Sequence, residues 1–412
     1  MKNLATLIRN GDARFARVWS IVSASLLLAT ASWSQSLTWL RTPPGGFWTI
    51  PTGVSADGSV VVGTADANNR AFRWTRVMGM VDLGTLGGSG SWATGVSADG
   101  SVVVGTAENA RGQYRAFRWV LTDPATGAGT MYDLGTLGGN RSEARDVSAD
   151  GRVVVGVALN AAGQWRAFRW VLTDPATGAG TMYDLGSIDA RAVSADGSVV
   201  VGTFYNNGQT RAFRWVLTDP ATGAGRLYDL GAPLGSNSEY DAYDVSADGR
   251  VVVGMAYDTS SWRATYFRWV LTNPNTGAGT MRSLGTYTFD ILNPLNPPSV
   301  SADGSIIIYS YFSDYNQPVS YIWTVQEGLS QLVLDFYPYT FPSGMDPVLN
   351  SISPNGRYIV GLGINAATES VEAFLLDTQL VSRCLDSDVN GDGVVDDADL
   401  LQVLFDFGRR CN

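Results

Sequence analysis

The stretch Val54-Ser55-Ala56-Asp57-Gly58-Ser59-Val60-Val61-Val62-Gly63 decides the fold, because it recurs along the chain with little change. Its seven copies are marked by the residue at the first acidic position: Asp57, Asp99, Asp150, Asp196, Asp248, Asp303 and, in a degenerate copy, Asn355. Successive copies are 42, 51, 46, 52, 55 and 52 residues apart. A period of about 40–50 residues with several strands in each unit is typical of a β-propeller.

Each unit contains four short apolar segments, which predicts one four-stranded blade per unit. In the second unit they are Ala93–Ser97, Val102–Val104, Arg115–Trp119 and Met131–Gly135. Ala-Asp-Gly turns the chain after the first segment, because Gly tolerates positive φ and an Asp side chain can bond nearby backbone amides. The continuous valine run predicts a strand buried on both faces. The third segment alternates polar and apolar residues, which predicts a strand nearer the solvent.

The seventh unit lacks a fourth segment, and the start of the chain supplies a replacement. The stretch Leu37-Thr38-Trp39-Leu40 resembles the fourth segment of the first unit, Val81-Asp82-Leu83. We expect it to pair as the outer strand of the last blade, because closing the ring removes exposed sheet edges. The sequence therefore predicts an all-β fold, with a seven-bladed propeller of four-stranded blades over residues 36–378 and a small C-terminal module.

Composition excludes several classes of function. The formal net charge is −10, which argues against nucleic acid and anionic membrane surfaces as partners. The chain has no His, and its only Lys is Lys2. This removes histidine bases, histidine metal ligands and Schiff-base lysines. Any catalysis would rest on Asp, Glu, Tyr, Ser or a metal, and the sequence marks no catalytic residue.

Residues 1–34 are predicted to be a signal peptide. Basic residues up to Arg17 precede the apolar run Val18–Ala31, and either Ala29-Thr30-Ala31 or Ser32-Trp33-Ser34 fits a cleavage site. The apolar run is short for a membrane span. We expect a secreted or cell-surface protein with no membrane span in the mature chain. An uncleaved anchor is the alternative.

In its repeated segments the chain resembles a known family. Val-Ser-x-Asp-Gly, Ala-Phe-Arg-Trp and Asp-Leu-Gly-Thr-Leu-Gly-Gly are similar to the HAF-type extracellular repeat of bacterial secreted propellers. The resemblance covers about residues 37–378. It implies an extracellular propeller and no particular activity.

Residues 379–412 form a separate module with a predicted calcium site. Within the twelve-residue loop 388–399, oxygen ligands fall at the calcium-binding positions: Asp388, Asn390, Asp392, the Val394 carbonyl, Asp396 and Asp399. Asp rather than Glu at the last position, followed by Leu400-Leu401, resembles a dockerin-type repeat. Dockerins carry two such repeats and this chain has one, which puts a cohesin-like partner in doubt.

The two cysteines of the chain, Cys384 and Cys411, flank this calcium loop. In an exported protein we expect them to form a disulfide. The bridge and the bound calcium would together stabilise a module too small to have a large core.

Two repeated features are expected to be structural rather than functional. The Asp of each Ala-Asp-Gly is interpreted as a turn former rather than part of a carboxylate ring. The Trp of each Phe-Arg-Trp segment is interpreted as packing between blades rather than a sugar platform. The neighbouring Arg is expected at the surface or between blades.

The variable loops are the predicted ligand face. In a four-stranded meander the Ala-Asp-Gly turns and the Asp-Pro-Ala-Thr-Gly loops share one face of the ring. The other face takes the loops that differ most between units. Those loops hold the candidate ligand-binding aromatics: Trp92, Tyr114, Trp165, Tyr205, Tyr240, Tyr243, Tyr257 and Trp262.

Three hypotheses of function follow. The first is a binding module for a glycan or a surface protein. The second is a carbohydrate-active enzyme, a glycoside hydrolase or lyase, which requires paired Asp or Glu in the central cleft. The third is a structural envelope protein, for which both faces would be flat and polar.

Overall fold

The computed structural model describes residues 36–41, 48–65, 69–206, 208–235, 238–258, 260–261, 263–288, 296–312, 318–326, 328–331, 347–365 and 367–378. The predicted signal peptide (1–34) and the predicted calcium module (379–412) lie outside these residues. Both stay predictions. In the described part of the chain, no helix is long and apolar enough to cross a membrane.

The described residues form seven antiparallel sheets of four strands each. Blade 1 contains β2 (Thr49–Val54), β3 (Val60–Ala65), β4 (Arg70–Thr75) and β5 (Gly79–Asp82). Blade 2 contains β6 (Gly87–Val96), β7 (Val102–Asn109), β8 (Tyr114–Asp123) and β9 (Ala128–Asp133). Blade 3 contains β10 (Gly138–Val147), β11 (Val153–Asn160), β12 (Trp165–Asp174) and β13 (Ala179–Gly186). Blade 4 contains β14 (Ile188–Val193), β15 (Val199–Asn206), β16 (Gln209–Asp219) and β17 (Ala224–Asp229).

The remaining blades follow the same meander. Blade 5 contains β18 (Glu239–Val245), β19 (Val251–Asp258), β20 (Arg263–Asn273) and β21 (Ala278–Thr288). Blade 6 contains β22 (Ser299–Val300), β23 (Ile306–Phe312), β24 (Pro318–Thr324) and β25 (Gly328–Gln331). Blade 7 contains β26 (Val348–Ile352), β27 (Tyr358–Asn365), β28 (Ser370–Asp377) and, as its outer strand, β1 (Ser36–Trp39).

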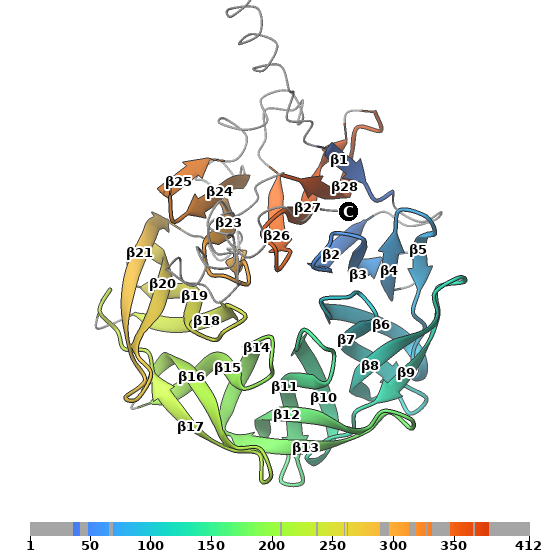
Figure 1. Cartoon of the computed structure of the whole chain (residues 1–412), viewed down its shortest axis with the longest axis horizontal. Coiled ribbons are helices and arrows are strands. Elements are labelled where there is room, and N and C mark those ends of the chain that lie inside the picture. The colour runs from blue at the N-terminus through green and yellow to red at the C-terminus, as the bar shows by residue number, and fades with distance from the viewer. Residues whose placement is uncertain are drawn as a thin grey trace, which may run out of the picture. The chain divides into compact units, whose positions relative to one another are not determined.

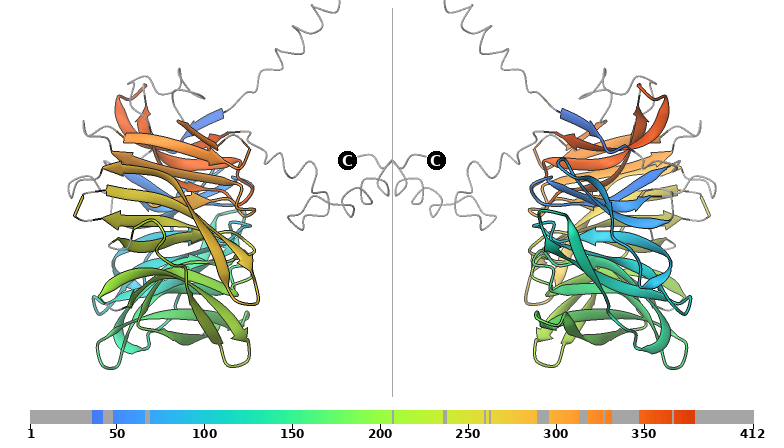
Figure 2. Two further views of the ribbon diagram at one scale, coloured as in Figure 1. Left: turned by 90° about the vertical axis from the view of Figure 1, so that its left-hand side faces the viewer. Right: turned by 90° about the vertical axis from the view of Figure 1, so that its right-hand side faces the viewer.

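The seven blades are arranged in a ring (Figure 1), so the predicted seven-bladed propeller is confirmed. Their strands run across the thickness of the ring (Figure 2), and the turns at the strand ends therefore form its two faces. The Ala-Asp-Gly turns and the hairpins between third and fourth strands lie on one face, called here the turn face. The opposite, variable face carries the loops between second and third strands and the blade connections.

The N-terminal strand closes the ring, as predicted. β1 pairs with β28, and the Leu40 amide donates a hydrogen bond of 2.9 Å to the Ala373 carbonyl. Leu40 is only 2% exposed and lies in a core cluster shared by blades 7 and 1. The Trp39 ring meets Phe374 edge-on at 6.1 Å between centroids. Strands from the two ends of the chain therefore complete one blade.

The repeated motif builds a turn that is held by hydrogen bonds from its own Ser and Asp side chains. The Ser55 hydroxyl donates to Asp57 at 2.8 Å and accepts from the Val60 amide at 3.0 Å. Asp57 also accepts from the Ser59 amide at 2.9 Å. Gly58 has φ +69°, a left-handed conformation that favours glycine. These bonds confirm that the motif Asp is a turn former.

The turns are also bonded to one another around the ring. The Ala56 amide donates to the Ala98 carbonyl at 2.9 Å, and the pattern repeats through each neighbour as far as Ala302, which donates to Pro354 at 2.8 Å. Six such bonds connect the seven turns. Pro354 has no amide hydrogen to donate onward to Ala56. The series therefore ends at the joint between blades 7 and 1.

The third strands are buried, which corrects the expectation that they lie nearer the solvent. In β8, Ala116, Phe117, Arg118 and Trp119 are all at most 6% exposed. The reason is the next blade: the Arg118 Nε donates to the carbonyl of Gly151 at 2.7 Å, across the interface. Arginines at this position in β4, β12, β16 and β20 make the same bond to the next turn. The arginine is therefore the predicted partner between blades.

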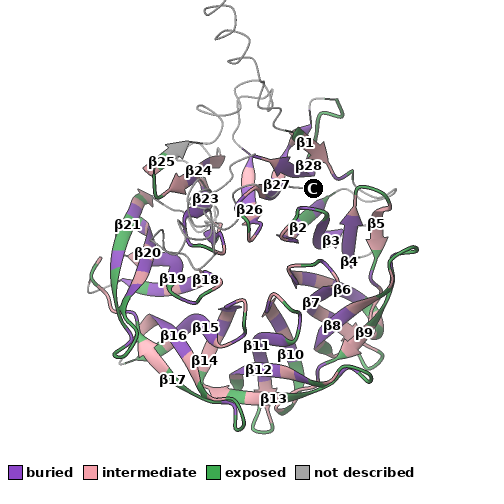
Figure 3. Ribbon diagram, viewed as in Figure 1, coloured by how far each residue is buried: buried purple, intermediate pink, exposed green. Residues whose placement is uncertain are grey.

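The core lies between blades rather than within them. Trp119 and Phe117 of blade 2 pack in one cluster with Val60 and Val62 of blade 1. Burial is deepest in the second and third strands and falls toward the outer strands (Figure 3). This confirms the interpretation of the repeated Trp as a packing residue.

Shortening the Leu40 side chain, which directly follows the closing strand β1, is expected to destabilise the whole ring. Leu40→Ala should cost about 2–5 kcal/mol of unfolding free energy, since it leaves a cavity in a buried cluster. Urea unfolding followed by tryptophan fluorescence measures this. Ser36→Ala, at the exposed first position of β1, is the control. Equal midpoints for Leu40→Ala and the wild type would contradict closure by β1.

Candidate functional site

The inner strands of the seven blades surround a central cavity of about 560 Å³. In six of these strands the pairing register shifts by one residue shortly before the turn, which is a β-bulge. The bulge residues line the cavity: Thr52, Thr94, Arg145, Arg191, Tyr243 and Asn350. The bulge therefore presents one side chain from each of these six blades to one shared space.

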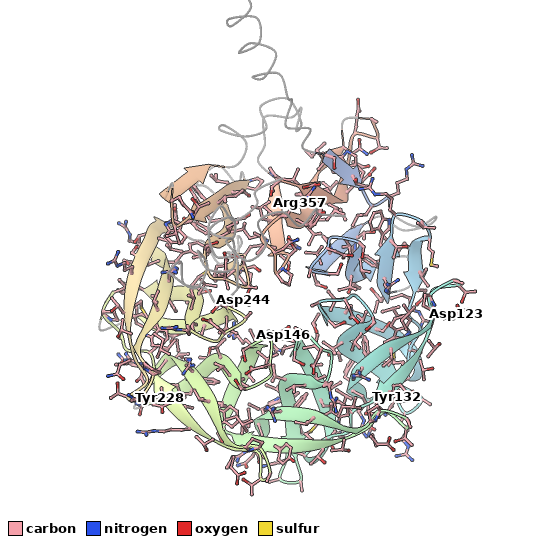
Figure 4. All side chains as sticks on the ribbon, viewed as in Figure 1. Asp123, Tyr132, Asp146, Tyr228, Asp244 and Arg357 are labelled. Atoms are coloured by element: carbon pink, nitrogen blue, oxygen red, sulfur yellow. The ribbon has the colours of Figure 1, made fainter. Side chains whose placement is uncertain are left out.

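Two carboxylates in the channel wall join neighbouring blades. Asp146 of blade 3 accepts from its neighbour Val147 at 2.7 Å and from Val193 of blade 4 at 2.8 Å. Asp244 of blade 5 accepts in the same way from Val245, at 2.7 Å, and from Val300 of blade 6, at 2.9 Å. Both lie at the inner edge of the ring (Figure 4).

Burial shifts the acidity of both groups. It raises the pKa of Asp146 to about 7, and the negative charge of Asp244 adds to this effect. Burial also raises the pKa of Asp244 to about 6. The backbone amides that bond the two carboxylates act in the opposite direction and are outweighed.

Two carboxylates thus lie in the channel wall, where an enzyme would need them, but their oxygens are occupied. Each oxygen of Asp146 and Asp244 accepts at least one backbone N–H. A carboxylate held in this way is poorly placed to attack a sugar or to transfer a proton to it. The geometry suits a cross-link between blades better than it suits catalysis.

A row of alternating charges follows the channel wall through blades 3 to 5. The Arg145 Nη2 lies 3.6 Å from Glu143 and 4.0 Å from Asp189. Arg191 lies 3.4 Å from Asp189 and 3.3 Å from Asp241. The Arg191 guanidinium also sits 4.4 Å from the centre of the Tyr243 ring. Three carboxylates and two arginines therefore form one connected row.

An aromatic platform adjoins this row on the variable face. We define it as Trp92, Tyr114, Arg141 and Trp165. The Arg141 guanidinium lies 4.9 Å from the Tyr114 ring centre and 5.5 Å from that of Trp165, while the Trp92 and Tyr114 rings are 5.7 Å apart. Arg141 donates to Glu143 at 2.7 Å and 3.0 Å. Glu143 therefore connects the platform to the charged row.

Three of the predicted ligand-binding aromatics belong to this platform, and two of them are well exposed. Tyr114 is 37% exposed and Trp165 is 44% exposed, because each begins a third strand at the variable face. Trp92 comes from the inner strand β6 and is partly buried. The sequence places these residues in separate units, and the fold brings them together.

The other predicted aromatics are placed differently. Tyr205 is 72% exposed and stands apart from the platform. Tyr243 and Tyr257 are partly buried, with their hydroxyls 3.0 Å apart. Tyr240 is fully buried, accepts from the Leu234 amide and donates to the Gly235 carbonyl, so it belongs to the core. Trp262 lies outside the described residues.

The sequence reasoning missed the charged members of the site. These are Arg141, Glu143, Arg145, Asp189, Arg191 and Asp241. A signal was present, since the residues just before each Val-Ser vary while the motif itself does not. Across the described residues, no group of three or more His, Cys, Asp or Glu side chains could hold a metal ion.

Comparisons with known proteins agree with the fold and go no further. The chain is similar to an oligogalacturonate lyase solved with manganese, at 14% identity and TM-score 0.52 over 84% of this chain and 94% of that one. It is similar to the Cps50 (Swd1) propeller domain of Myceliophteria thermophila, at 13% identity and TM-score 0.47 over 83% and 99%. A putative TolB from Agrobacterium tumefaciens has 14% identity and TM-score 0.42 over 59% and 82%.

No protein-family model matches the chain, and no curated protein does. At 14% identity, the likeness to the oligogalacturonate lyase shows the fold alone. The resemblances to HAF-type and dockerin-type repeats stay predictions.

The channel carboxylates predict a specific pH dependence of stability. Their pKa is higher in the folded chain than the ordinary value, so the stability they contribute is complete below about pH 4 and is lost as the pH rises through 6 to 7. Between pH 5 and pH 8 we expect the wild type to lose about 1–2 kcal/mol of unfolding free energy from Asp146. Asp146→Asn should lose less, as urea unfolding at both pH values would measure.

Asp123→Asn is the control for this measurement. The Thr126 hydroxyl lowers the pKa of Asp123, which therefore stays ionised throughout this pH range. Its pH dependence should match the wild type. An equal loss of stability in Asp146→Asn and the wild type would contradict the raised pKa of Asp146.

Proposed function

We propose that this protein is an exported glycan-binding β-propeller whose ligand lies on the aromatic platform of the variable face. The observation that carries the proposal is the stacking of Arg141 between Tyr114 and Trp165, beside the fixed carboxylate of Glu143. Flat aromatic rings offer an apolar surface to the carbon–hydrogen face of a sugar, and the charged groups can bond its hydroxyls.

The platform favours binding over a purely structural role. Trp, Tyr and Arg are the residues that carry most binding energy at recognition surfaces. Here they are partly exposed and held in place by neighbours, so little side-chain freedom is lost on binding. A surface with only a supporting role has no need of such an arrangement.

The platform also favours a glycan over a folded protein partner. Glu143 bonds Arg141 of the platform and pairs with Arg145, which lines the channel cavity of about 560 Å³; the platform residues themselves do not line that cavity. This is a normal volume for a small-molecule site and too small for a protein domain. The enzyme alternative has less support, because the oxygens of the channel carboxylates already accept backbone hydrogen bonds.

Removing a platform ring should weaken glycan binding. We expect Trp165→Ala and Tyr114→Ala to lower the affinity for oligosaccharides at least about tenfold, since a well-packed aromatic contact is worth more than 1 kcal/mol. A glycan array on the full chain would identify a ligand, and calorimetry would give the affinities. Tyr205→Ala removes an exposed tyrosine away from the platform and should bind as the wild type does. Equal loss in all three variants would contradict the platform.

We also propose that the C-terminal module binds calcium through the loop 388–399. The support comes from the sequence: the spacing of Asp388, Asn390 and Asp392, with Gly393 at the sharp turn. The role proposed for this module is attachment or docking of the secreted propeller. A cohesin-like partner has little support, because the chain carries one repeat.

Calcium should protect this module from proteolysis. Because metal binding and folding are coupled in small modules, Asp388→Ala is expected to abolish the protection that calcium gives to residues 379–412. Limited proteolysis with calcium or a chelator, read by mass spectrometry, measures this. Asp82→Ala, in the propeller, should keep the protection. Protection of Asp388→Ala equal to that of the wild type would exclude the site.

A further inference from the structure

Arg145 and Arg191 are side chains of neighbouring blades that both line the central cavity. They occupy the bulge position, which holds Thr52 and Thr94 in the first two blades and Asn350 in the last. Both approach Asp189, at 4.0 Å and 3.4 Å, so the two guanidinium groups lie close together. The channel wall therefore carries two guanidinium groups side by side, each flanked by carboxylates.

These arginines differ from the structural arginines of the same chain. The Arg118 Nε donates a 2.7 Å hydrogen bond to a carbonyl, and Arg357 holds Asp377 with two bonds of 2.7 Å and 2.8 Å. Among the described residues, Arg145 makes no hydrogen bond, and its ion pairs of 3.6 Å and 4.0 Å are too long to be one. The Arg191 Nη2 donates a longer hydrogen bond of 3.3 Å to Asp241, and its Nε is buried without a hydrogen-bond partner.

The Arg145 side chain lines the cavity and is 37% exposed, so its donors are accessible to a ligand there. A guanidinium carries five N–H donors in a planar fork, which matches the two oxygens of a carboxylate. Glu143 and Asp189 orient Arg145 without using those donors, since they stay beyond hydrogen-bond distance. The arrangement therefore holds the arginine ready for a carboxylate from outside the chain.

The cavity sets the size and charge of that ligand. A volume of about 560 Å³ is far larger than a bare carboxylate needs and suits one or two sugar rings. Asp146 and Asp244 lie in the same wall, so a doubly charged phosphate would meet more repulsion than a singly charged carboxylate.

We propose that the central channel binds the carboxylate of an acidic sugar through Arg145, with Arg191 beside it. The inference rests on the proposed glycan binding and names the sugar class for the channel end of the site. Glu143 connects the two parts, because it bonds Arg141 of the platform and pairs with Arg145 of the channel. A chain of sugars on the platform could thus place an acidic unit in the channel.

The test compares glucuronic acid with glucose, which share a ring and differ in the carboxylate. In calorimetry on the full chain, we expect glucuronic acid to bind at least about tenfold more tightly than glucose, as a charge-assisted bidentate contact should provide. Arg145→Gln and Arg191→Gln should each reduce this preference. Arg111→Gln, at an exposed loop position, should keep it. Melting temperatures confirm that the variants fold.

Four results would overturn the proposal. They are equal affinity of the wild type for glucuronic acid and glucose, an unchanged preference in Arg145→Gln, and binding of acetate or inorganic phosphate as tight as that of glucuronic acid. The fourth is loss of the preference in Trp165→Ala, which would place the carboxylate on the platform. If Trp165→Ala keeps the preference and loses neutral oligosaccharides, both proposals stand. If it keeps both, the platform proposal alone fails.

Discussion

The hydrogen-bonded turn of the Ser-x-Asp-Gly motif is the constraint on which the propeller depends. In each blade the Ser hydroxyl and a side-chain oxygen, from Asp in six blades and from Asn355 in blade 7, bond within the turn, so the backbone of one turn is free to bond the next. The buried arginine of each of the first five blades then bonds the glycine carbonyl of the following turn. The same residues therefore form the turn within each blade and the contacts between neighbouring blades.

This arrangement separates scaffold from recognition. The turn face is bonded around the ring and tolerates little variation, because a Cβ at Gly100 or Gly151 would approach a valine of the preceding blade within 2.6 Å. The bulge in the inner strands has the opposite effect. The bulge directs one side chain into the channel while antiparallel pairing continues on both sides of it. The residue at this position therefore differs between blades, as Thr94, Arg145 and Tyr243 do. The side chains available to contact a ligand therefore occupy positions that do not hold the ring together.

The sequence was sufficient for the repeated parts of the structure and insufficient for the parts that depend on distance between units. Blade number, strand order and the closing role of Leu37–Leu40 follow from period and segment matching, and all were confirmed. The turn function of Asp57 followed from its neighbours in the chain. Burial of Arg118 could not be read from alternation, because its partner Gly151 is 33 residues away.

The candidate site was predicted only in part for the same reason. Exposed aromatics such as Tyr114 and Trp165 could be placed on the variable face from loop position alone. Arg141, which joins them, lies in the inner strand β10 and meets Tyr114 across a blade boundary and Trp165 within its own blade. Tyr240 looks like its neighbours in sequence, yet its ring faces the core. The sequence pattern predicts on which face of the ring a side chain lies, but only the fold shows which side chains surround it there.

The near-identity of the middle blades has a consequence for how the chain assembles. Residues 115–135 and 166–186 are the same, so the surfaces they present to their neighbours are interchangeable. A blade that packed against the wrong copy would make the same contacts through these residues, so they would not destabilise the incorrect pairing. The error would be felt only at the last joint, where Pro354 offers no amide, Tyr358 covers Gly58, and Asn350 bonds Pro51. Incorrect pairing of blades is therefore excluded at the joint between blades 7 and 1, whose contacts differ from those of the other joints.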